Sequence, residues 1–295
     1  MPSCNVVGRV SGEKSYECYF ATPHALKNLS SRKRIFTPKL FNKNKHERSN
    51  ENPTIAYQDK TVLTIITITK NNANDLRETI SSFLMQTDKD FDVILVNGGS
   101  KIEWTDFGIE SLRITELCDD GHGIYSAMNL GLDHVKEGNV IFINAGDMLA
   151  NQHVIENLRK TNAAKRVITG GTEVIGERYQ WTLSSARRCH NSMIFPKSNI
   201  RYDLNLKIFS DSKYISENID YFGEQEVEYV ISKFMLGGVS NKTNWRLIAA
   251  SFRERGWGFG LLEVVKGIMI FFLGETARYV IYLLKGVKGE RKSSA

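Results

Sequence analysis

The sequence VIFINAGD, residues 140–147, gives the clearest indication of the fold. Its first half, Val140–Ile143, is an apolar run of the kind that forms a buried strand. Asp147 follows after a short turn that contains a glycine. In open α/β sheets, ligands bind beyond the carboxyl ends of the strands. One carboxylate there can hold a divalent cation whose other ligands are water and substrate phosphates. A solvated aspartate in a polar turn is the alternative interpretation of this tetrapeptide.

Strand patterns alternate with helical patterns around this stretch. The first strand pattern, TVLTIITIT at residues 61–69, is apolar and rich in β-branched residues. Strands separated by helices predict a mostly parallel sheet that is covered by helices on both faces. Further strands are expected at residues 91–96, 112–117, 140–143, 166–169, 192–195 and 229–235, and helices at 73–86, 124–135, 151–159 and 211–218.

The 295 residues divide into three parts by composition. Residues 1–60 are polar and basic, and we expect them to be partly disordered. Residues 61–255 carry the α/β pattern and form the expected main domain. Residues 256–295 mix apolar stretches with cations and are expected to be an amphipathic helical segment.

Charge and cysteine content restrict the classes of partner and compartment. The net charge of +6 suits an anionic ligand or an anionic membrane surface. No basic-aromatic motif accompanies the charge, so we expect no nucleic-acid partner. The four cysteines are scattered without a C-x-x-C pair, which fits a reducing compartment and argues against a zinc site or a disulfide scaffold. The first residues lack the apolar core of a secretory signal, so the sequence predicts a cytoplasmic protein.

The C-terminal segment has the composition of an interfacial helix. Its apolar stretches, Ile268–Leu273 and Tyr279–Leu284, are separated by Glu275 and Arg278. Neither approaches the roughly 20 residues that span a bilayer. Interspersed cations and aromatics predict peripheral attachment to the cytoplasmic membrane. Packing on the core or on a partner subunit is the alternative.

Four segments taken in order carry a resemblance to a known family. They are TVLTIITITKN (61–71), LVNGGS (95–100), GIYSAMNLGL (123–132) and INAGD (143–147). With this order and spacing the chain resembles the family 2 glycosyltransferases of the GT-A fold, and among them the bacterial envelope-polysaccharide transferases of the colanic acid type. Later segments resemble further elements of that branch, namely CHNS (189–192), RYDL (201–204), SD (210–211) and FMLGGVS (234–240). The resemblance covers roughly residues 61–255.

The resemblance implies a metal-dependent, inverting glycosyltransferase of the hexosyltransferase type. It would move a sugar from a nucleotide-sugar donor to a lipid-linked or polysaccharide acceptor in envelope glycan synthesis. Asp147 matches the family's metal-binding acid for Mn²⁺ or Mg²⁺. His190 would be a metal or diphosphate contact, and a hydrogen-bonded structural histidine is the alternative. Asp211 matches the carboxylate that acts as general base. A helix N-terminal aspartate that favours the macrodipole is the alternative for Asp211.

The resemblance also implies a set of donor-binding residues. Thr69 matches a position that lines the nucleobase pocket, and the glycine turn after residue 97 would let backbone N–H groups approach the nucleotide. A helix that begins after Gly123 would point its N-terminus at the diphosphate. Core packing is the alternative for Tyr125 and Met128. The expected donor-binding residues are Thr69, Asn97, Gly98, Gly99, Ser100, Gly123, Tyr125, Asn129 and Asn144.

Three acidic positions of the branch are replaced in this chain, by Asn97, Gly121 and Ser126. These replacements motivate a second hypothesis, a catalytically weak nucleotide-sugar-binding partner of another transferase. A sugar-1-phosphate nucleotidylyltransferase shares the same kind of sheet. It ranks lower because it would need a glycine-rich loop with a basic residue after the first strand, where this chain has Thr69–Asn72.

Overall fold

The computed structural model describes residues 62–236 apart from 105–106, 162–164 and 178. It also describes strands at 6–10, 19–20 and 289–291 and scattered positions between 249 and 280. The described helices are α1 (Ala73–Leu84), α2 (Ile124–His134), α3 (Val154–Lys160) and α4 (Ser210–Phe222), with short 3₁₀ turns at Ser185–Arg187 and His190–Ser192. The strands are β1 (Val6–Val10), β2 (Tyr19–Phe20), β3 (Leu63–Thr69), β4 (Asp92–Asn97), β5 (Arg113–Cys118), β6 (Asn139–Phe142), β7 (Met148–Leu149), β8 (Val167–Ile175), β9 (Tyr179–Leu183), β10 (Met193–Pro196), β11 (Glu224–Met235) and β12 (Gly289–Arg291).

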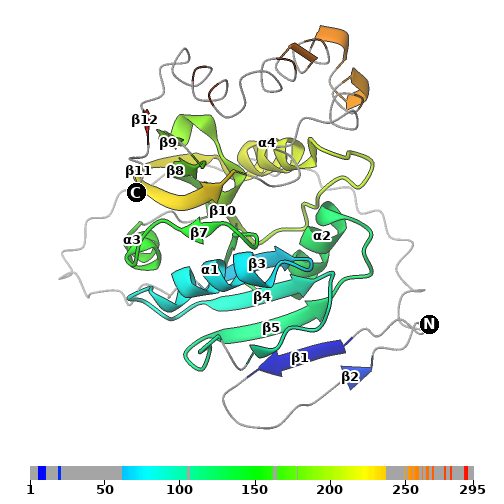
Figure 1. Cartoon of the computed structure of the whole chain (residues 1–295), viewed down its shortest axis with the longest axis vertical. Helices are drawn as coiled ribbons and strands as arrows, with labels where there is room; N and C mark the ends of the chain where they lie inside the picture. Colours follow the sequence, from blue (N-terminus) through cyan, green and yellow to red (C-terminus); the bar gives the residue numbers. More distant parts are fainter. Residues whose placement is uncertain are drawn as a thin grey trace, which may run out of the picture.

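One mixed sheet organises the molecule around a parallel centre (Figure 1). The described strands follow the order β12-β9-β8-β10-β6-β3-β4-β5-β1-β2, and β11 pairs with both β7 and β8. Strands β6, β3, β4 and β5 run parallel to one another. Their carboxyl ends meet at one edge, where Thr69 is in register with Asn97 and Asn97 with Cys118.

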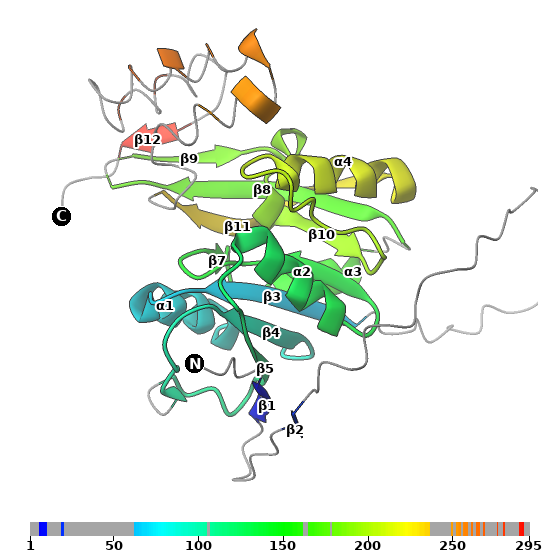
Figure 2. The ribbon, with the colours of Figure 1, turned by 90° about the vertical axis from the view of Figure 1, so that its right-hand side faces the viewer.

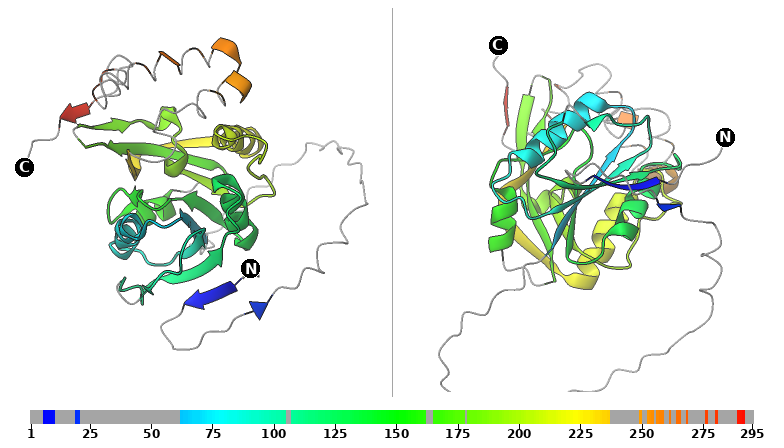
Figure 3. Two further views of the ribbon diagram at one scale, coloured as in Figure 1. Left: turned by 45° about the vertical axis from the view of Figure 1, so that its right-hand side comes forward. Right: turned by 90° about the horizontal axis from the view of Figure 1, so that it is seen from below.

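Helices cover both faces of this parallel centre (Figures 2 and 3). Strand β3 is buried on both sides, as its run of β-branched and apolar residues predicts. Ile65 belongs to the core cluster that contains the apolar faces of α1 and α3. Ile66 belongs to the opposite cluster, which α2 and α4 complete. The expected mostly parallel α/β sheet with helices on both faces is therefore confirmed.

The antiparallel part of the sheet differs most from expectation. Strand β10 runs antiparallel to both β6 and β8. Strand β8 is longer than the expected 166–169, because it continues through two buried glycines to Ile175. It then pairs antiparallel with β9, a strand that the pattern analysis missed. Strand β11 begins at Glu224, five residues before the expected start at residue 229.

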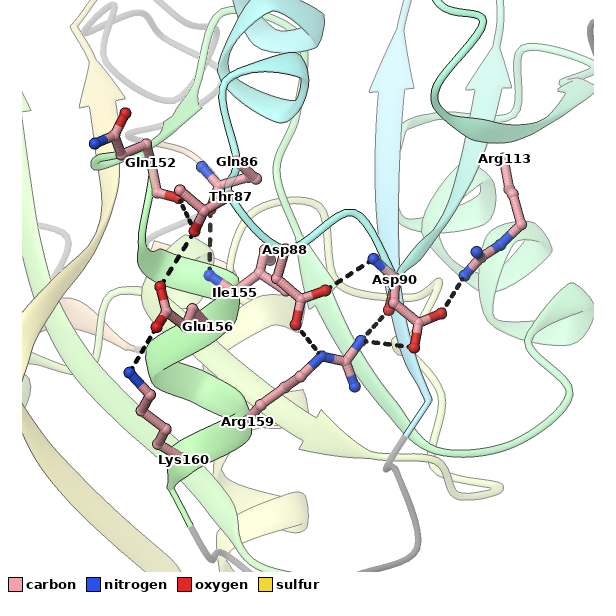
Figure 4. A network of polar contacts seen from close by, with 10 residues as sticks. All are labelled: Gln86, Thr87, Asp88, Asp90, Arg113, Gln152, Ile155, Glu156, Arg159 and Lys160. Atoms are coloured by element: carbon pink, nitrogen blue, oxygen red, sulfur yellow. Dashed lines mark hydrogen bonds and ion pairs between the residues drawn. The ribbon is translucent and has the colours of Figure 1, made fainter.

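Charged side chains close the opposite edge of the sheet, where the parallel strands begin (Figure 4). Arg159, in the last turn of α3, places Nε 2.5 Å from Asp88 Oδ2 and Nη2 3.6 Å from Asp90 Oδ2. Arg113, at the start of β5, pairs with Asp90 at 3.1 Å and with Asp92 at 2.6 Å. This network joins α3 to the entry of β4 and β5.

The structure describes only some residues at the two ends of the chain. The polar and basic 1–60 segment contains β1 and β2, and β1 pairs antiparallel with β5. The remainder of the predicted disordered part lies outside the described residues, as does most of the predicted amphipathic segment 256–295. Within the described part of the chain, no helix combines the length and apolar character needed to cross a membrane.

Candidate active site

The predicted ligand-binding edge is formed by loops that leave β3, β4, β5 and β6. The loop after β4 packs on the loop after β3, since Ser100 N donates to Asn71 Oδ1 at 2.9 Å. A Cβ on Gly99 would lie 2.4 Å from the same Asn71 oxygen and 2.6 Å from Asn71 N. Real Cβ atoms do not approach so closely, so the contact requires glycine at position 99.

The glycine turn after β4 is closed by the protein's own atoms. Gly98 N donates to Thr69 O and Gly99 N donates to Asn97 Oδ1, each at 2.9 Å. The Asn97 amide nitrogen donates in turn to Ser100 O at 2.9 Å and to Glu116 Oε1 at 3.1 Å. This differs from the expectation that the backbone N–H groups of the turn approach a nucleotide.

Thr69 ends β3 at this edge and is buried. Its hydroxyl donates to Asn72 Oδ1 at 2.6 Å, and its carbonyl accepts from Gly98. The Thr69 side chain therefore helps to shape the loop between β3 and α1. Asp119, just after β5, completes this rim, because its carboxylate lies 3.2 Å from where a Gly98 Cβ would stand.

The NAGD sequence forms the tight turn that its glycine predicts. Asp147 N donates to Asn144 O at 2.9 Å, and Gly146 has φ +102°, a backbone conformation that favours glycine. Thr79 of α1 holds the turn through two hydrogen bonds. Its hydroxyl donates to Asp147 O at 2.7 Å and accepts from Gly146 N at 2.9 Å. The turn is thus held by a residue 68 positions earlier in the chain.

Asp147 is a buried carboxylate, with 8% of its surface exposed. Oδ1 accepts a hydrogen bond from Met235 N, at the end of β11, at 3.2 Å. Burial raises the pKa of Asp147 to about 7, and the hydrogen bond from Met235 N opposes that rise. The Asn144 side-chain oxygen is also buried, and it finds no hydrogen-bond partner among the described residues.

His190 lies in an aromatic cluster behind the turn. Its Nε2 atom is 2.5 Å from the Tyr202 hydroxyl, and its ring centroid is 4.9 Å from that of Phe142. Tyr202 stacks on Tyr214 with a centroid separation of 4.2 Å. Burial lowers the pKa of His190 to about 4, so the ring is neutral at physiological pH. In this arrangement Nε2 is engaged by Tyr202, and a metal would have to use Nδ1.

Helix α2 begins at this edge, with Gly123 at φ +108° before its first turn. Two predicted donor-binding residues of this helix hold the segment that leads to α4. Asn129 binds both backbone groups of Tyr202, at 2.8 and 2.9 Å. Tyr125 stacks on Tyr202 at 5.6 Å and donates its hydroxyl to Ile208 O. Tyr125 therefore packs against the core cluster, as its alternative interpretation predicts. Met128 is buried in the same cluster.

Asp211 lies in the first turn of α4 and is half-buried. Its Oδ1 accepts from Ser212 N at 2.7 Å. The carboxylate is close enough to Tyr125 and Tyr202 to help raise the pKa of both phenols, where burial is the main cause.

Asp147 and Asp211 both lie within electrostatic range of Cys189. Burial raises the pKa of the Cys189 thiol to about 11, a hydrogen bond with Thr172 opposes this, and the charges of Asp147 and Asp211 both raise it further. The structure therefore places these two predicted carboxylates, which are distant in sequence, within electrostatic range of one side chain. No group of three or more His, Cys, Asp and Glu residues that could hold a metal occurs within the described part of the chain.

Sequence reasoning missed several residues that shape the site. Thr79 has the sequence pattern of an ordinary helix residue, yet its hydroxyl binds the Asp147 carbonyl. Met235 binds the Asp147 carboxylate through its backbone N–H, which any residue type could provide. Glu254 accepts hydrogen bonds from the segment just before α4, although it is more than 40 residues away. None of these contacts has a local sequence signal.

Comparison with known proteins identifies the family model that this chain matches. The model described as "Glycosyl transferase family 2" matches residues 64–216, just over half of the chain. A curated relative from Rickettsia bellii, an uncharacterised glycosyltransferase, is 32% identical over 120 residues, which are 39% of this chain and 17% of the relative. Another from Rickettsia prowazekii is 30% identical over 121 residues, 40% of this chain and 38% of the relative. The chain thus spans less than half the length of these relatives.

Solved structures with similar folds show lower similarity. Staphylococcus aureus TarS (residues 1–349) in complex with UDP has a TM-score of 0.47 and 12% identity, over 72% of this chain and 73% of the other. The mannosyltransferase PcManGT from Pyrobaculum calidifontis, in complex with GDP-Man and Mn²⁺, has a TM-score of 0.47 and 13% identity, over 76% and 75%.

Proposed function

This chain belongs to glycosyl transferase family 2, and from this premise we propose that it is a metal-dependent, inverting transferase of the hexosyltransferase type. Its donor is a nucleotide sugar, and its acceptor is a lipid-linked glycan or a polysaccharide of the cell envelope. The sequence motifs favour the branch that includes the colanic acid enzymes. The GT-A sheet of the main domain provides the frame for this chemistry.

One observation supports the proposal: Asp147 follows β6, and the segment that leads to Asp211 is bound by Tyr125 at the start of α2, so both segments lie at the carboxyl edge of the parallel strands. Both carboxylates are close enough to the Cys189 thiol to help raise its pKa, for which burial is the main cause. Glycosyl transfer needs two opposed functions, one at the departing diphosphate and one at the attacking hydroxyl. Two carboxylates at a ligand-binding edge can supply these functions.

The residues near Asp147 fit a divalent cation. Mg²⁺ and Mn²⁺ prefer oxygen ligands, and such ions are often held by one or two carboxylates together with substrate phosphates. Asp147 offers a carboxylate, and the buried Asn144 oxygen has no described partner. When bound, the cation would act as a Lewis acid that neutralises charge on the leaving diphosphate. Asp147 would hold it, and the Thr79 contact would fix the turn.

Asp211 is the proposed general base. It would accept the proton of the acceptor hydroxyl as the oxygen attacks the anomeric carbon. Tyr125 donates its hydroxyl to Ile208 O, three residues before Asp211, and stacks on Tyr202. Burial raises the pKa of both phenols. These phenols stay protonated at neutral pH, so Asp211 is the group of this cluster that can take the proton.

An apolar face on the C-terminal segment supports a membrane-bound acceptor. Trp257, Leu261, Val265 and Ile268 are spaced by three or four residues and are 85%, 62%, 49% and 53% exposed. This is the spacing of one helix face. We call these four residues the apolar face. A helix of this kind lies in the plane of a membrane interface, so we propose peripheral attachment at the cytoplasmic membrane, next to a lipid-linked acceptor.

The donor class is tested by ligand-dependent thermal stabilisation. UDP-, GDP- and TDP-sugars are each added with Mn²⁺ and with EDTA, and the melting temperature is recorded. We expect one nucleotide class to stabilise the protein in a metal-dependent manner. If no donor raises the melting temperature under either condition, the nucleotide-sugar assignment fails.

A catalytically weak donor-binding partner is the second candidate, because the Asn97 amide that replaces an expected carboxylate is bound within its own loop. Hydrolysis of the stabilising donor in the presence of Mn²⁺ separates the two. Turnover that is lost with EDTA supports the transferase. Binding without turnover, also when membranes and envelope glycans are supplied as acceptors, supports the partner.

The role of Asp211 is tested by Asp211→Asn. General base catalysis typically contributes about 10²–10⁴-fold, so kcat should fall within that range while donor affinity stays nearly unchanged. Loss of donor affinity with a normal kcat would make Asp211 a binding residue. The proton acceptor would then have to be another carboxylate, such as Asp203 or Glu217.

A further inference from the structure

Three consecutive backbone amides before α4 donate to one distant carboxylate. Lys207 N lies 2.8 Å from Glu254 Oε1, and Ile208 N and Phe209 N each lie 3.3 Å from Glu254 Oε2. Successive N–H groups that converge in this way form an anion-binding concavity. Here the anion is a side chain of the C-terminal segment.

The contact lies at the N-terminal end of α4, whose N-cap residue makes no side-chain cap hydrogen bond. The first amides of any α-helix lack intrahelical partners, and a side-chain oxygen at the N-cap usually binds one of them. Phe209 occupies the N-cap of α4 and has no side-chain oxygen to offer. Glu254 brings a negative charge to the same helix end, where the helix dipole favours it. The start of α4 is therefore held from outside the helix.

The segment held by Glu254 also carries contacts of the site. Ile208 O accepts the Tyr125 hydroxyl, and Lys213 N donates to Phe209 O at 3.1 Å in the first turn of the helix. Asp211 comes two residues after Phe209. A shift of residues 207–209 would therefore move the Asp211 carboxylate and the Tyr125 contact together.

We propose that Glu254 is a positioning residue for Asp211: by binding the amides of residues 207–209 it fixes the start of α4 in the orientation that proton transfer needs. The C-terminal segment would then complete the active site as well as contact the membrane. This inference rests on the proposed role of Asp211 as general base. Glu254 itself touches neither donor nor acceptor in this scheme.

The contact is tested by hydrogen exchange in the full-length protein. Glu254→Ala removes all three acceptor contacts, whereas Glu254→Gln keeps one neutral oxygen. The amides of residues 207–209 should exchange fastest in the alanine variant, at an intermediate rate in the glutamine variant, and slowest in wild type. Glu137→Gln, an exposed glutamate before β6, is the matched control and should leave these amides unchanged. Equal exchange in all four proteins would overturn the proposal.

The catalytic role is tested by a double-mutant cycle, with metal-dependent hydrolysis of the stabilising nucleotide sugar as the assay. A displacement of about 1 Å at a reacting group can cost about 10²-fold. Glu254→Ala should therefore lower kcat by about 10-fold to 10²-fold with little change in donor KM. In an Asp211→Asn background the same substitution should have almost no further effect, because coupled residues are not additive.

The outcomes separate this inference from the function on which it rests. If Asp211→Asn lowers kcat and Glu254→Ala does not, or if the two losses multiply, the positioning role is wrong and the base assignment stands. If Asp211→Asn retains full kcat, the base assignment is wrong, and the positioning role falls with it. If circular dichroism shows that Glu254→Ala does not fold, the kinetic test uses Glu254→Gln instead. A normal kcat of Glu254→Gln would then contradict the proposal.

Discussion

At the residue scale, Asp147 combines a buried position with a charge that its surroundings stabilise poorly. Asp147→Asn is nearly isosteric, and its side-chain oxygen can still accept the Met235 N–H. We expect the variant to keep its fold but lose most metal-dependent turnover, because a neutral amide binds a divalent cation weakly. The measurement is donor hydrolysis over a Mn²⁺ titration. Full activity of the variant, or of wild type in excess chelator, would contradict the assignment of Asp147 as metal ligand.

The same carboxylate should give stability an unusual pH dependence. Its native pKa of about 7 lies above the ordinary 3.8, so between these values the native state holds a proton that the unfolded chain has released. The free energy of unfolding of the metal-free protein should therefore decrease as the pH rises from about 4 to 7. At about 1.4 kcal/mol per pKa unit, this group contributes a few kcal/mol over that range.

Urea unfolding of wild type and Asp147→Asn in EDTA checks this prediction. The variant should gain stability relative to wild type between pH 5 and pH 8. Asp203→Asn is a control whose difference from wild type should stay constant between pH 5 and pH 8, because the Lys213 ammonium, 2.8 Å away, lowers the pKa of Asp203. Stabilisation by Asp203 is present above its unfolded pKa and is lost as the pH falls. A difference between wild type and Asp147→Asn that does not change with pH would show that Asp147 titrates normally.

At the element scale, the Arg159 network holds α3 against the entries of β4 and β5. Arg159 and Asp88 are largely buried, with about a fifth of each side chain exposed. Removal of one partner from such a contact leaves polar groups without hydrogen bonds, at about 1–3 kcal/mol. Arg159→Ala should lower the free energy of unfolding by this amount in chemical denaturation, while donor binding at the opposite edge stays unchanged.

Lys160→Ala is the matched control for Arg159→Ala. Lys160 is the next residue of α3 and pairs with Glu156 at 2.6 Å, but 69% of its side chain is exposed. Surface pairs of this kind contribute about 0–1 kcal/mol. Equal destabilisation by the two substitutions would show that the Arg159 network adds nothing beyond a surface ion pair.

The elements of the parallel centre could be predicted because their signals are local. Buried parallel strands are apolar throughout, and the runs at 61–69 and 140–143 show this clearly. Strand β8 was predicted too short because glycine is rare in strands, whereas here a buried Ile231 side chain packs against Gly170. The start of β11, EQEVE, is polar and gave no strand signal, although it pairs with β8.

The candidate site divides in the same way. The turn at 144–147 could be predicted because one glycine sets its geometry. The contacts that hold the site join residues 68, 88 and 45 to 47 positions apart, and a single sequence contains no record of them. The motif positions alone did not reveal that Asn129 and Tyr125 bind the protein's own backbone. Their predicted role in donor binding stays a prediction.

At the scale of the whole molecule, the apolar face should determine membrane attachment. Leu261→Glu combined with Val265→Glu places two carboxylates on this face without removing any residue of the main domain. We expect the full-length variant to lose co-sedimentation with anionic liposomes at low salt, because burial of a carboxylate in the interface is unfavourable. Met85→Glu is the control, since Met85 is 62% exposed beside α1, on the main domain. Failure of wild type to bind these liposomes would favour packing within an oligomer.

Trp257 gives the apolar face an optical signal of its own. Its indole is 85% exposed, and it meets the Phe252 ring edge-on at 5.3 Å, two residues from Glu254. Trp181, by contrast, is 2% exposed in the interior of the sheet. An exposed indole emits at longer wavelength than a buried one, because water relaxes around its excited state. The chain has four tryptophans, so a shift of the emission toward the blue that is absent from Trp257→Phe would report in real time that this end of the chain leaves water.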